Sequence, residues 1–222
     1  MRIGALILIA FLYAQCRSIS GTEQPISKEA TGNLPVGGGC DGCELMYTGM
    51  PETIDAIDTS AGWFAQGQKL IVTGTVFQHN ESTPARDVII YYWQTDQNGL
   101  YAAEDGMDDK VKAHGHIRGL VKTDEKGYYR MHTIRPAPYP DDVIPAHIHF
   151  SIKEPDVINA YYTDDILFSG DSLLASWQKK YPAENRGGSG IVHPVCAAST
   201  QIAHHDIILG KNIPHYRKMT GK

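Results

Sequence analysis

Two histidines and two tyrosines of this chain have the types and the spacing to hold one metal ion. His147 and His149 alternate in the apolar run Pro145-Ala-His-Ile-His-Phe150, which is the pattern of a half-buried strand. Alternate residues of a strand lie on one face, about 6.6 Å apart at about 3.3 Å of rise each, so the two imidazoles can bind a single ion. A prolyl loop before this strand carries Tyr139, and the segment after an earlier strand carries Tyr101. These four side chains are the candidate metal ligands.

Phenol ligands narrow the choice of metal. The pKa of a free tyrosine is about 10, so two neutral tyrosines are poor ligands at neutral pH. A trivalent ion such as iron(III) favours the charged phenolate and can deprotonate both phenols. Zinc draws on cysteine, histidine and carboxylate rather than on paired tyrosines, so a zinc or copper hydrolase built on the two histidines ranks last. We therefore expect Fe(3+) as the cofactor.

Strands have to position these ligands. Residues 70–77 alternate between apolar and polar positions, and residues 88–93 form a compact β-branched and aromatic run. The turn at residues 124–127 is predicted to close a hairpin, and residues 171–180 are predicted as a short amphipathic helix. Strands of this spacing with glycine and proline between them predict an all-β fold, an antiparallel β-sandwich with few short helices.

The bulk properties fit one soluble domain. The chain has 222 residues, of which 42% are apolar and 20% charged, with a net charge of −5. It has no long basic run, so nucleic acid and anionic membrane surfaces are not expected as partners.

The N-terminus resembles an export signal. A basic start and an apolar core of about ten residues, too short to span a bilayer, predict a signal peptide over residues 1–18. Cys16 stands where a bacterial lipoprotein carries its acylated cysteine, so the protein is expected to be secreted, periplasmic or lipid-anchored outside the cytoplasm. Residues 19–60 are predicted as a linker and extension, and residues 61–222 as the sandwich domain.

Three cysteines follow the signal. Export implies an oxidising compartment, which favours a structural disulfide. Cys40 and Cys43 either pair with each other or one of them pairs with Cys196; a zinc or redox site at this CxxC is the less favoured alternative.

The ligand motifs resemble those of the intradiol ring-cleavage dioxygenases, which include the protocatechuate, catechol and hydroxyquinol dioxygenases. The resemblance rests on "WQTDQNGLY", "TIRPAPYP" and "PAHIHF", and extends over about residues 70–172 with "TDEKGYYRM" and "FSGD". It implies a β-sandwich that holds non-haem iron(III) and uses O₂ to open a catechol ring between its two hydroxyl-bearing carbons, giving a muconate-type diacid. A small-molecule catechol and O₂ are the implied partners. The resemblance also implies that Tyr139 is the axial ligand, which leaves the metal when substrate binds and takes up a substrate proton.

The chain departs from the family at two positions on the substrate side. Ile144 stands where family members usually carry an arginine, whose charge is thought to stabilise negative charge on the substrate. Asp165 stands in place of a glutamine. Arg118 and Arg135 are candidates to supply the missing cation, although Arg135 is equally well interpreted as a loop residue.

Other interpretations remain open. A secreted β-sandwich binding module with a vestigial metal site is the alternative function. His114 and His116 form a second His-x-His pair, but Glu125 is too far along the chain for a cupin site, so they are predicted to line a pocket or a loop. The histidines at 193, 204 and 205 are predicted to lie at the surface or at a sheet edge, and the oligomeric state is open.

Overall fold

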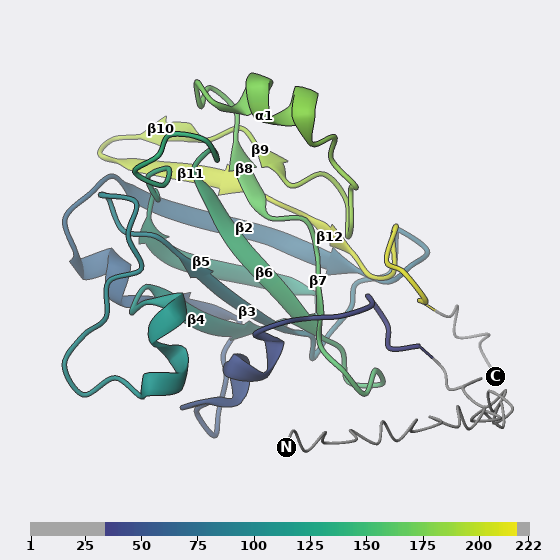
Figure 1. Ribbon diagram of the computed structural model, residues 1–222. Helices are drawn as coiled ribbons and strands as arrows, with labels where there is room; N and C mark the ends of the chain where they lie inside the picture. Colours follow the sequence, from purple (N-terminus) through teal and green to yellow (C-terminus); the bar gives the residue numbers. More distant parts are fainter. Residues whose placement is uncertain (1–33, 217–222) are drawn as a thin grey trace, which may run out of the picture. The chain divides into compact units, whose positions relative to one another are not determined.

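Two β-sheets form the body of the protein (Figure 1). The computed structural model describes residues 34–216. The first sheet has six strands, in the order β1 (Ile57–Thr59), β5 (Tyr128–Ile134), β2 (Lys69–Phe77), β11 (Thr200–His204) and β10 (Val195–Ala197), with β12 (Ile207–Ile208) also paired to β2. The second sheet has six strands, in the order β4 (Arg118–Lys122), β3 (Ile89–Gln94), β6 (His147–Lys153), β8 (Ile166–Phe168) and β9 (Ile191–Val192), with β7 (Tyr161–Tyr162) paired to β6.

Helices are few and short. The described residues hold one α-helix, α1 (Leu174–Lys180), and the 3-10 helices η1 (Cys43–Tyr47), η2 (Ala61–Phe64) and η3 (Asp109–His114). The predicted helix over residues 171–180 therefore begins three residues later than expected. The Asp171 carboxylate accepts the backbone N–H groups of Leu173 and Ala146, both at 2.9 Å, which joins the start of this helix to the segment that leads into β6. The predicted all-β sandwich with few short helices is confirmed.

The core lies between the two sheets. Val72 and Met131 from the first sheet and Ile90 and Phe150 from the second belong to one cluster of fully buried side chains. Each such side chain stabilises the fold by about 1.5–3 kcal/mol relative to its exposed state. Because one face of each sheet is buried in this cluster, the alternation seen in the sequence fixes which residues of β6 face the core and which face outward.

The turn at residues 124–127 does not close a hairpin, which corrects the prediction. β4 pairs with β3 and β5 pairs with β2 and β1, so this turn carries the chain from one sheet to the other. Its local chemistry is that of a tight turn: the Asp124 carboxylate accepts the backbone N–H groups of Lys126 and Tyr128, and Gly127 has a φ of +68°. The same residues can turn a chain within one sheet or between two, and only the packing of the strands decides which.

Parallel pairs supplement the antiparallel ladders. Among the described strands, β2 pairs in parallel with β11 and β12, β1 with β5, and β8 with β9. The strand β6, which carries the two candidate histidines, pairs with β3 and β8 in antiparallel ladders.

Residues 34–60 include ordered elements. Cys43 and Met46 of η1 pack on Tyr91 and Trp93 in a second buried cluster. This covering explains why β3 is buried along almost its whole length. The strand β1 pairs with β5, so part of the predicted extension belongs to the first sheet.

The structure pairs Cys40 with Cys43, which settles the choice left open by the sequence, and leaves Cys196 free and exposed on β10. The predicted signal peptide and Cys16 lie outside the described residues. Within residues 34–216, no helix has the length and apolar character needed to cross a membrane.

Candidate metal centre

The strand β6 supplies the two histidines of the candidate site. His147 and His149 are two residues apart and lie on the same face of the strand, as the period of a strand requires. Trp93 of β3 lies opposite His149 in the antiparallel ladder, and the two rings stack with their centroids 4.8 Å apart. A neighbouring strand therefore fixes the plane of one imidazole.

Two loops supply the tyrosines. In the loop before Tyr101, the Asp96 carboxylate accepts the backbone N–H groups of Asn98 at 2.8 Å and Leu100 at 3.1 Å. Gly99 in this loop has a φ of +78°, and a Cβ atom there would lie 2.0 Å from the carbonyl oxygen of Pro138. The loop that carries Tyr101 therefore contacts the loop that carries Tyr139 so closely that only glycine fits.

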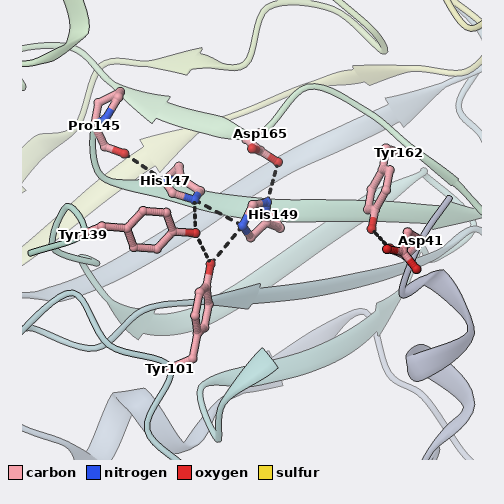
Figure 2. A network of polar contacts seen from close by, with 8 residues as sticks. All are labelled: Asp41, Tyr101, Tyr139, Pro145, His147, His149, Tyr162 and Asp165. Atoms are coloured by element: carbon pink, nitrogen blue, oxygen red, sulfur yellow. Dashed lines mark hydrogen bonds and ion pairs between the residues drawn. The ribbon is translucent and has the colours of Figure 1, made fainter. Parts of the chain in front are cut away.

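The four donor atoms converge (Figure 2). The Tyr101 Oη lies 2.9 Å from both the Tyr139 Oη and the His149 Nε2. The His147 Nε2 lies 3.2 Å from the Tyr139 Oη and 3.1 Å from the His149 Nε2. Neighbouring ligands that each sit about 2 Å from a shared ion have separations of this size. The four predicted ligands thus come together, from two loops and one strand.

The second nitrogen of each imidazole is bonded away from the donors. The His147 Nδ1 donates to the Pro145 carbonyl oxygen at 2.8 Å, and the His149 Nδ1 donates to the Asp165 Oδ1 at 3.0 Å (Figure 2). A carbonyl and a carboxylate oxygen can only accept from these nitrogens, so each ring carries its proton on Nδ1 and offers the lone pair of Nε2 to the centre. Both histidines are therefore set in the tautomer that a metal ligand needs.

Burial favours the neutral forms of the two tyrosines and of His147. Desolvation raises the pKa of Tyr101 and of Tyr139 above the usual tyrosine range, and the adjacent phenol raises that of Tyr101 further. Burial and the neighbouring His149 lower the pKa of His147. Two phenols with raised pKa values need a strong Lewis acid to become ligands, so the donor set fits a trivalent ion such as iron(III).

Comparison with known proteins decides the family. The dioxygenase family model matches residues 48–185, which is more than half of the chain. The chain belongs to the intradiol dioxygenase family. The chain is 32% identical over 115 residues to the protocatechuate 3,4-dioxygenase beta chain of Burkholderia cepacia, a match that covers 49% of this chain and 48% of the relative. It is 28% identical over 125 residues to the catechol 1,2-dioxygenase of Acinetobacter baylyi, covering 49% of this chain and 39% of that relative.

Solved structures share the fold. The dioxygenase domain of a carbohydrate-binding fusion protein from Streptomyces sp. SirexAA-E has a TM-score of 0.54 at 22% identity, over 72% of this chain and 90% of that chain. The catechol 1,2-dioxygenase from Acinetobacter sp. ADP1 has a TM-score of 0.54 at 20% identity, over 70% of this chain and 58% of that chain. The chain spans about half or less of the length of the curated relatives named above.

A cavity of about 580 Å³ opens beside the two histidines. His147 and His149 form part of its wall, together with Trp93, Ile144 and Asp165, while the two tyrosines lie outside the lining. Ile144 and Asp165, the two predicted departures from the family, therefore face the same space. A small aromatic molecule in this cavity would contact the imidazoles and the apolar side chain of Ile144.

The two arginines proposed as substitute cations do not line this cavity. The guanidinium of Arg118 lies 3.4 Å from the carbonyl oxygen of Thr48, and that of Arg135 lies over the ring of Phe168, 4.3 Å from its centroid. Burial lowers the pKa of Arg135. The structure therefore brings neither arginine together with the four candidate ligands, and their predicted catalytic roles stay predictions.

Sequence reasoning missed three features. The first is the hydrogen bond from His149 to Asp165, a residue that the sequence assigned to the substrate side. The second is the stack of His114 on Trp93, with centroids 4.2 Å apart, which extends the support behind His149. His114 was predicted to line a pocket or a loop; it is the last residue of the 3-10 helix η3 and is not part of the cavity lining. The third is a correction: His205 is buried, and its Nδ1 lies 3.0 Å from the hydroxyl of Tyr129. No spacing signal marks a histidine that is buried by strands distant in the sequence.

Proposed function

We propose that this intradiol dioxygenase binds iron(III) through Tyr101, Tyr139, His147 and His149 and opens the ring of a catechol with O₂. The observation that carries the proposal is the convergence of the four donor atoms, with contacts of 2.9–3.2 Å and both histidines presenting Nε2. Bound iron(III) would act as a Lewis acid on the catechol and as a template for its orientation.

The side chains around the candidate metal centre would have separate roles in the reaction. The resemblance to the intradiol dioxygenases implies that Tyr139 is the ligand that the substrate displaces. We assign it the task of accepting a proton from a catechol hydroxyl. Tyr101 and the histidines would keep the site assembled, since Asp165, Pro145 and Trp93 fix both imidazole rings. The apolar side chain of Ile144 would pack against the catechol ring and exclude water from that wall of the cavity.

Iron binding and oxygen uptake test the proposal. Protein loaded with ferric ion should show a visible absorption band from the bound phenolates and should consume O₂ with simple catechols. Tyr101→Phe and His147→Ala should lose most of the iron or shift the band, whereas Tyr128→Phe, whose hydroxyl has no hydrogen-bond partner among the described residues, should leave both unchanged. Unchanged iron content and catechol cleavage in both ligand variants would show that the assignment is wrong.

A binding module with a vestigial metal site is the second candidate. It is favoured by one observation, the apolar Ile144 in the wall of the cavity where a charge would assist turnover. This alternative predicts a protein that stays colourless when supplied with ferric ion and consumes no O₂ with any catechol.

We also propose that the enzyme acts outside the cytoplasm. The disulfide between Cys40 and Cys43 supports this location, because disulfides persist mainly in oxidising compartments. Labelling the free thiols of protein isolated from its source would report the redox state of this pair.

A further inference from the structure

We propose that the cavity selects catechols with a cationic substituent, such as an ammonium group on a short side chain, and disfavours catechols with a carboxylate. This inference rests on the proposed function, since it concerns the substrate of the same site. Three observations support it: which charged residues line the cavity, which partners those residues already have, and which apolar and aromatic residues form the other walls.

Carboxylates outnumber cations around the cavity. Among the described residues that line it, Asp164, Asp165 and Glu184 are acidic and Arg186 is the one arginine or lysine. The Arg186 Nε lies 2.5 Å from the Glu184 Oε2, so the guanidinium already has an ionic partner. A substrate carboxylate would have to compete with Glu184 for this cation.

The carboxylate closest to the metal centre keeps one oxygen free. The Asp165 Oδ1 accepts from His149, but its Oδ2 has no hydrogen-bond partner among the described residues, and the side chain is 37% exposed. The Asp164 carboxylate is used differently, since its two oxygens accept the backbone N–H groups of Asn185 at 2.8 Å and Arg186 at 3.1 Å. Asp165 is therefore the acidic group that can accept a hydrogen bond from a substrate ammonium.

The other walls also suit a cation. Ile144 offers no charge, and the aromatic residues Trp177 and Tyr162 line the same cavity. Aromatic faces attract cations and give nothing comparable to anions. Lys180, at the end of α1, is exposed and lies over the ring of Tyr181, 5.1 Å from its centroid.

The cavity has room for a substituted ring. A benzene ring occupies a cavity of about 150 Å³, and this cavity measures about 580 Å³. A catechol held at the two histidines would therefore leave space for a side chain of several atoms beside the acidic residues.

Electrostatics sets the size of the expected preference. Two unit charges about 4 Å apart interact by roughly 1 kcal/mol in water and more strongly in a partly buried site. We therefore expect an ammonium substituent to bind about tenfold more tightly than a neutral one, and a carboxylate about tenfold more weakly. Salt should reduce both differences, because the cavity is open to solvent.

Three probes with the same two-carbon side chain test the inference: 4-(2-aminoethyl)catechol, 4-ethylcatechol and 3-(3,4-dihydroxyphenyl)propanoate. Iron-loaded protein is titrated with each probe without O₂, the change in the visible band gives the dissociation constant, and O₂ uptake then gives kcat/KM. The expected order of affinity is ammonium, then ethyl, then carboxylate. Equal affinities, or a preference for the carboxylate, would overturn the inference while leaving the proposed function intact.

Two variants test whether Glu184 and Ile144 cause the preference for the ammonium probe. Glu184→Gln removes one negative charge and releases Arg186, so the advantage of the ammonium probe should shrink at least threefold. Ile144→Arg places a cation in the wall and should favour the carboxylate probe, whereas Ile144→Met, the matched control, should keep the original order. With folding checked by circular dichroism, a Glu184→Gln variant that keeps the full ammonium advantage, or an Ile144→Arg variant that keeps the original order, would contradict the inference. A protein whose iron responds to none of the three probes would refute the proposed function itself.

Discussion

The two histidines of the metal centre differ in the group that holds their second nitrogen. His147 donates to a neutral carbonyl oxygen, whereas His149 donates to the carboxylate of Asp165. A carboxylate partner makes an imidazole a stronger electron donor and also fixes its orientation. Asp165 is therefore a positioning residue for one ligand as well as part of the cavity wall.

This role predicts a graded response to substitution at Asp165. Asp165→Ala removes both the hydrogen bond and the charge, and should weaken iron retention about tenfold or more, which is the usual effect of losing such a partner. Asp165→Asn keeps an acceptor oxygen for the His149 Nδ1, so its iron retention should fall less. Competition with an iron chelator measures retention, and Asp156→Asn at an exposed turn is the control. Equal retention in all three variants would show that Asp165 does not support His149.

At the residue scale, the sequence predicted the meeting of the four ligands because residue type and spacing carry that information. Two histidines at i and i+2 on a strand must share a face, and paired tyrosines point to one kind of ion. The partner of His149 could not be predicted, because Asp165 is sixteen positions away and only the pairing of β6 with β8 brings it close.

At the scale of elements, the centre depends on how closely two loops approach. Gly99 contacts the carbonyl group of Pro138, so the loop of Tyr101 and the loop of Tyr139 set each other's positions. The strand β6 is rigid by comparison, since its histidines belong to a sheet with partners on both sides. Any change in the distance between the loops would move the phenols and leave the imidazoles in place.

Gly99→Ala should therefore weaken iron binding, although Gly99 is not itself a candidate ligand. A Cβ atom at this position would lie 2.0 Å from the Pro138 carbonyl oxygen and would force the two loops apart. We expect iron affinity to fall at least tenfold while the sandwich remains folded. Gly106→Ala is the matched control, because Gly106 also has a positive φ, of +81°, but a Cβ atom there meets nothing within 4 Å. If iron affinity is the same in the two variants, the contact between the loops does not position the tyrosines.

The strands and the turn show which features of the fold local sequence patterns predict and which they do not. The alternation of residues 70–77 predicted β2 to within one residue, because burial on one face imposes that pattern. The turn at residues 124–127 was placed correctly but assigned to a hairpin. Turn chemistry depends on residues close in sequence, whereas the choice of sheet depends on core packing between distant strands.

At the scale of the whole molecule, a titratable group lies between the two sheets. His205 contacts the hydroxyl of Tyr129 from the first sheet, and its ring meets that of Phe150 from the second with centroids 5.5 Å apart. Burial lowers the pKa of His205 to about 4. The sandwich was predictable from strand spacing, but this histidine was not, because its burial results from the closing of both sheets.

The stability of the fold should therefore decrease in mild acid. Between about pH 6.5 and pH 4 the unfolded chain binds a proton at residue 205 that the folded protein does not, so the free energy of unfolding falls as the pH falls through this window. We expect His205 to account for a loss of about 2 kcal/mol between pH 7 and pH 5.

Urea unfolding at the two pH values measures this contribution. His205→Gln, which keeps hydrogen-bonding groups near Tyr129, should show a smaller loss than the unaltered protein. Part of the dependence should remain, since burial also lowers the pKa of His114 to about 4. An identical loss in the variant would mean that His205 does not titrate in this way.

Residues 34–60, which include the segment that packs on Trp93, have a practical consequence for anyone who shortens this protein. The carbonyl oxygen of Asp41 accepts a hydrogen bond from Tyr162 in the cavity wall (Figure 2), Met46 belongs to the same buried cluster as Trp93, and β1 completes an edge of the first sheet. A version that starts at residue 61 would expose the indole on which His149 stacks and would leave β5 with an open edge. Versions intended for iron loading should therefore start no later than residue 34, because residues 34–60 help to position the ligands although they are distant from them in sequence.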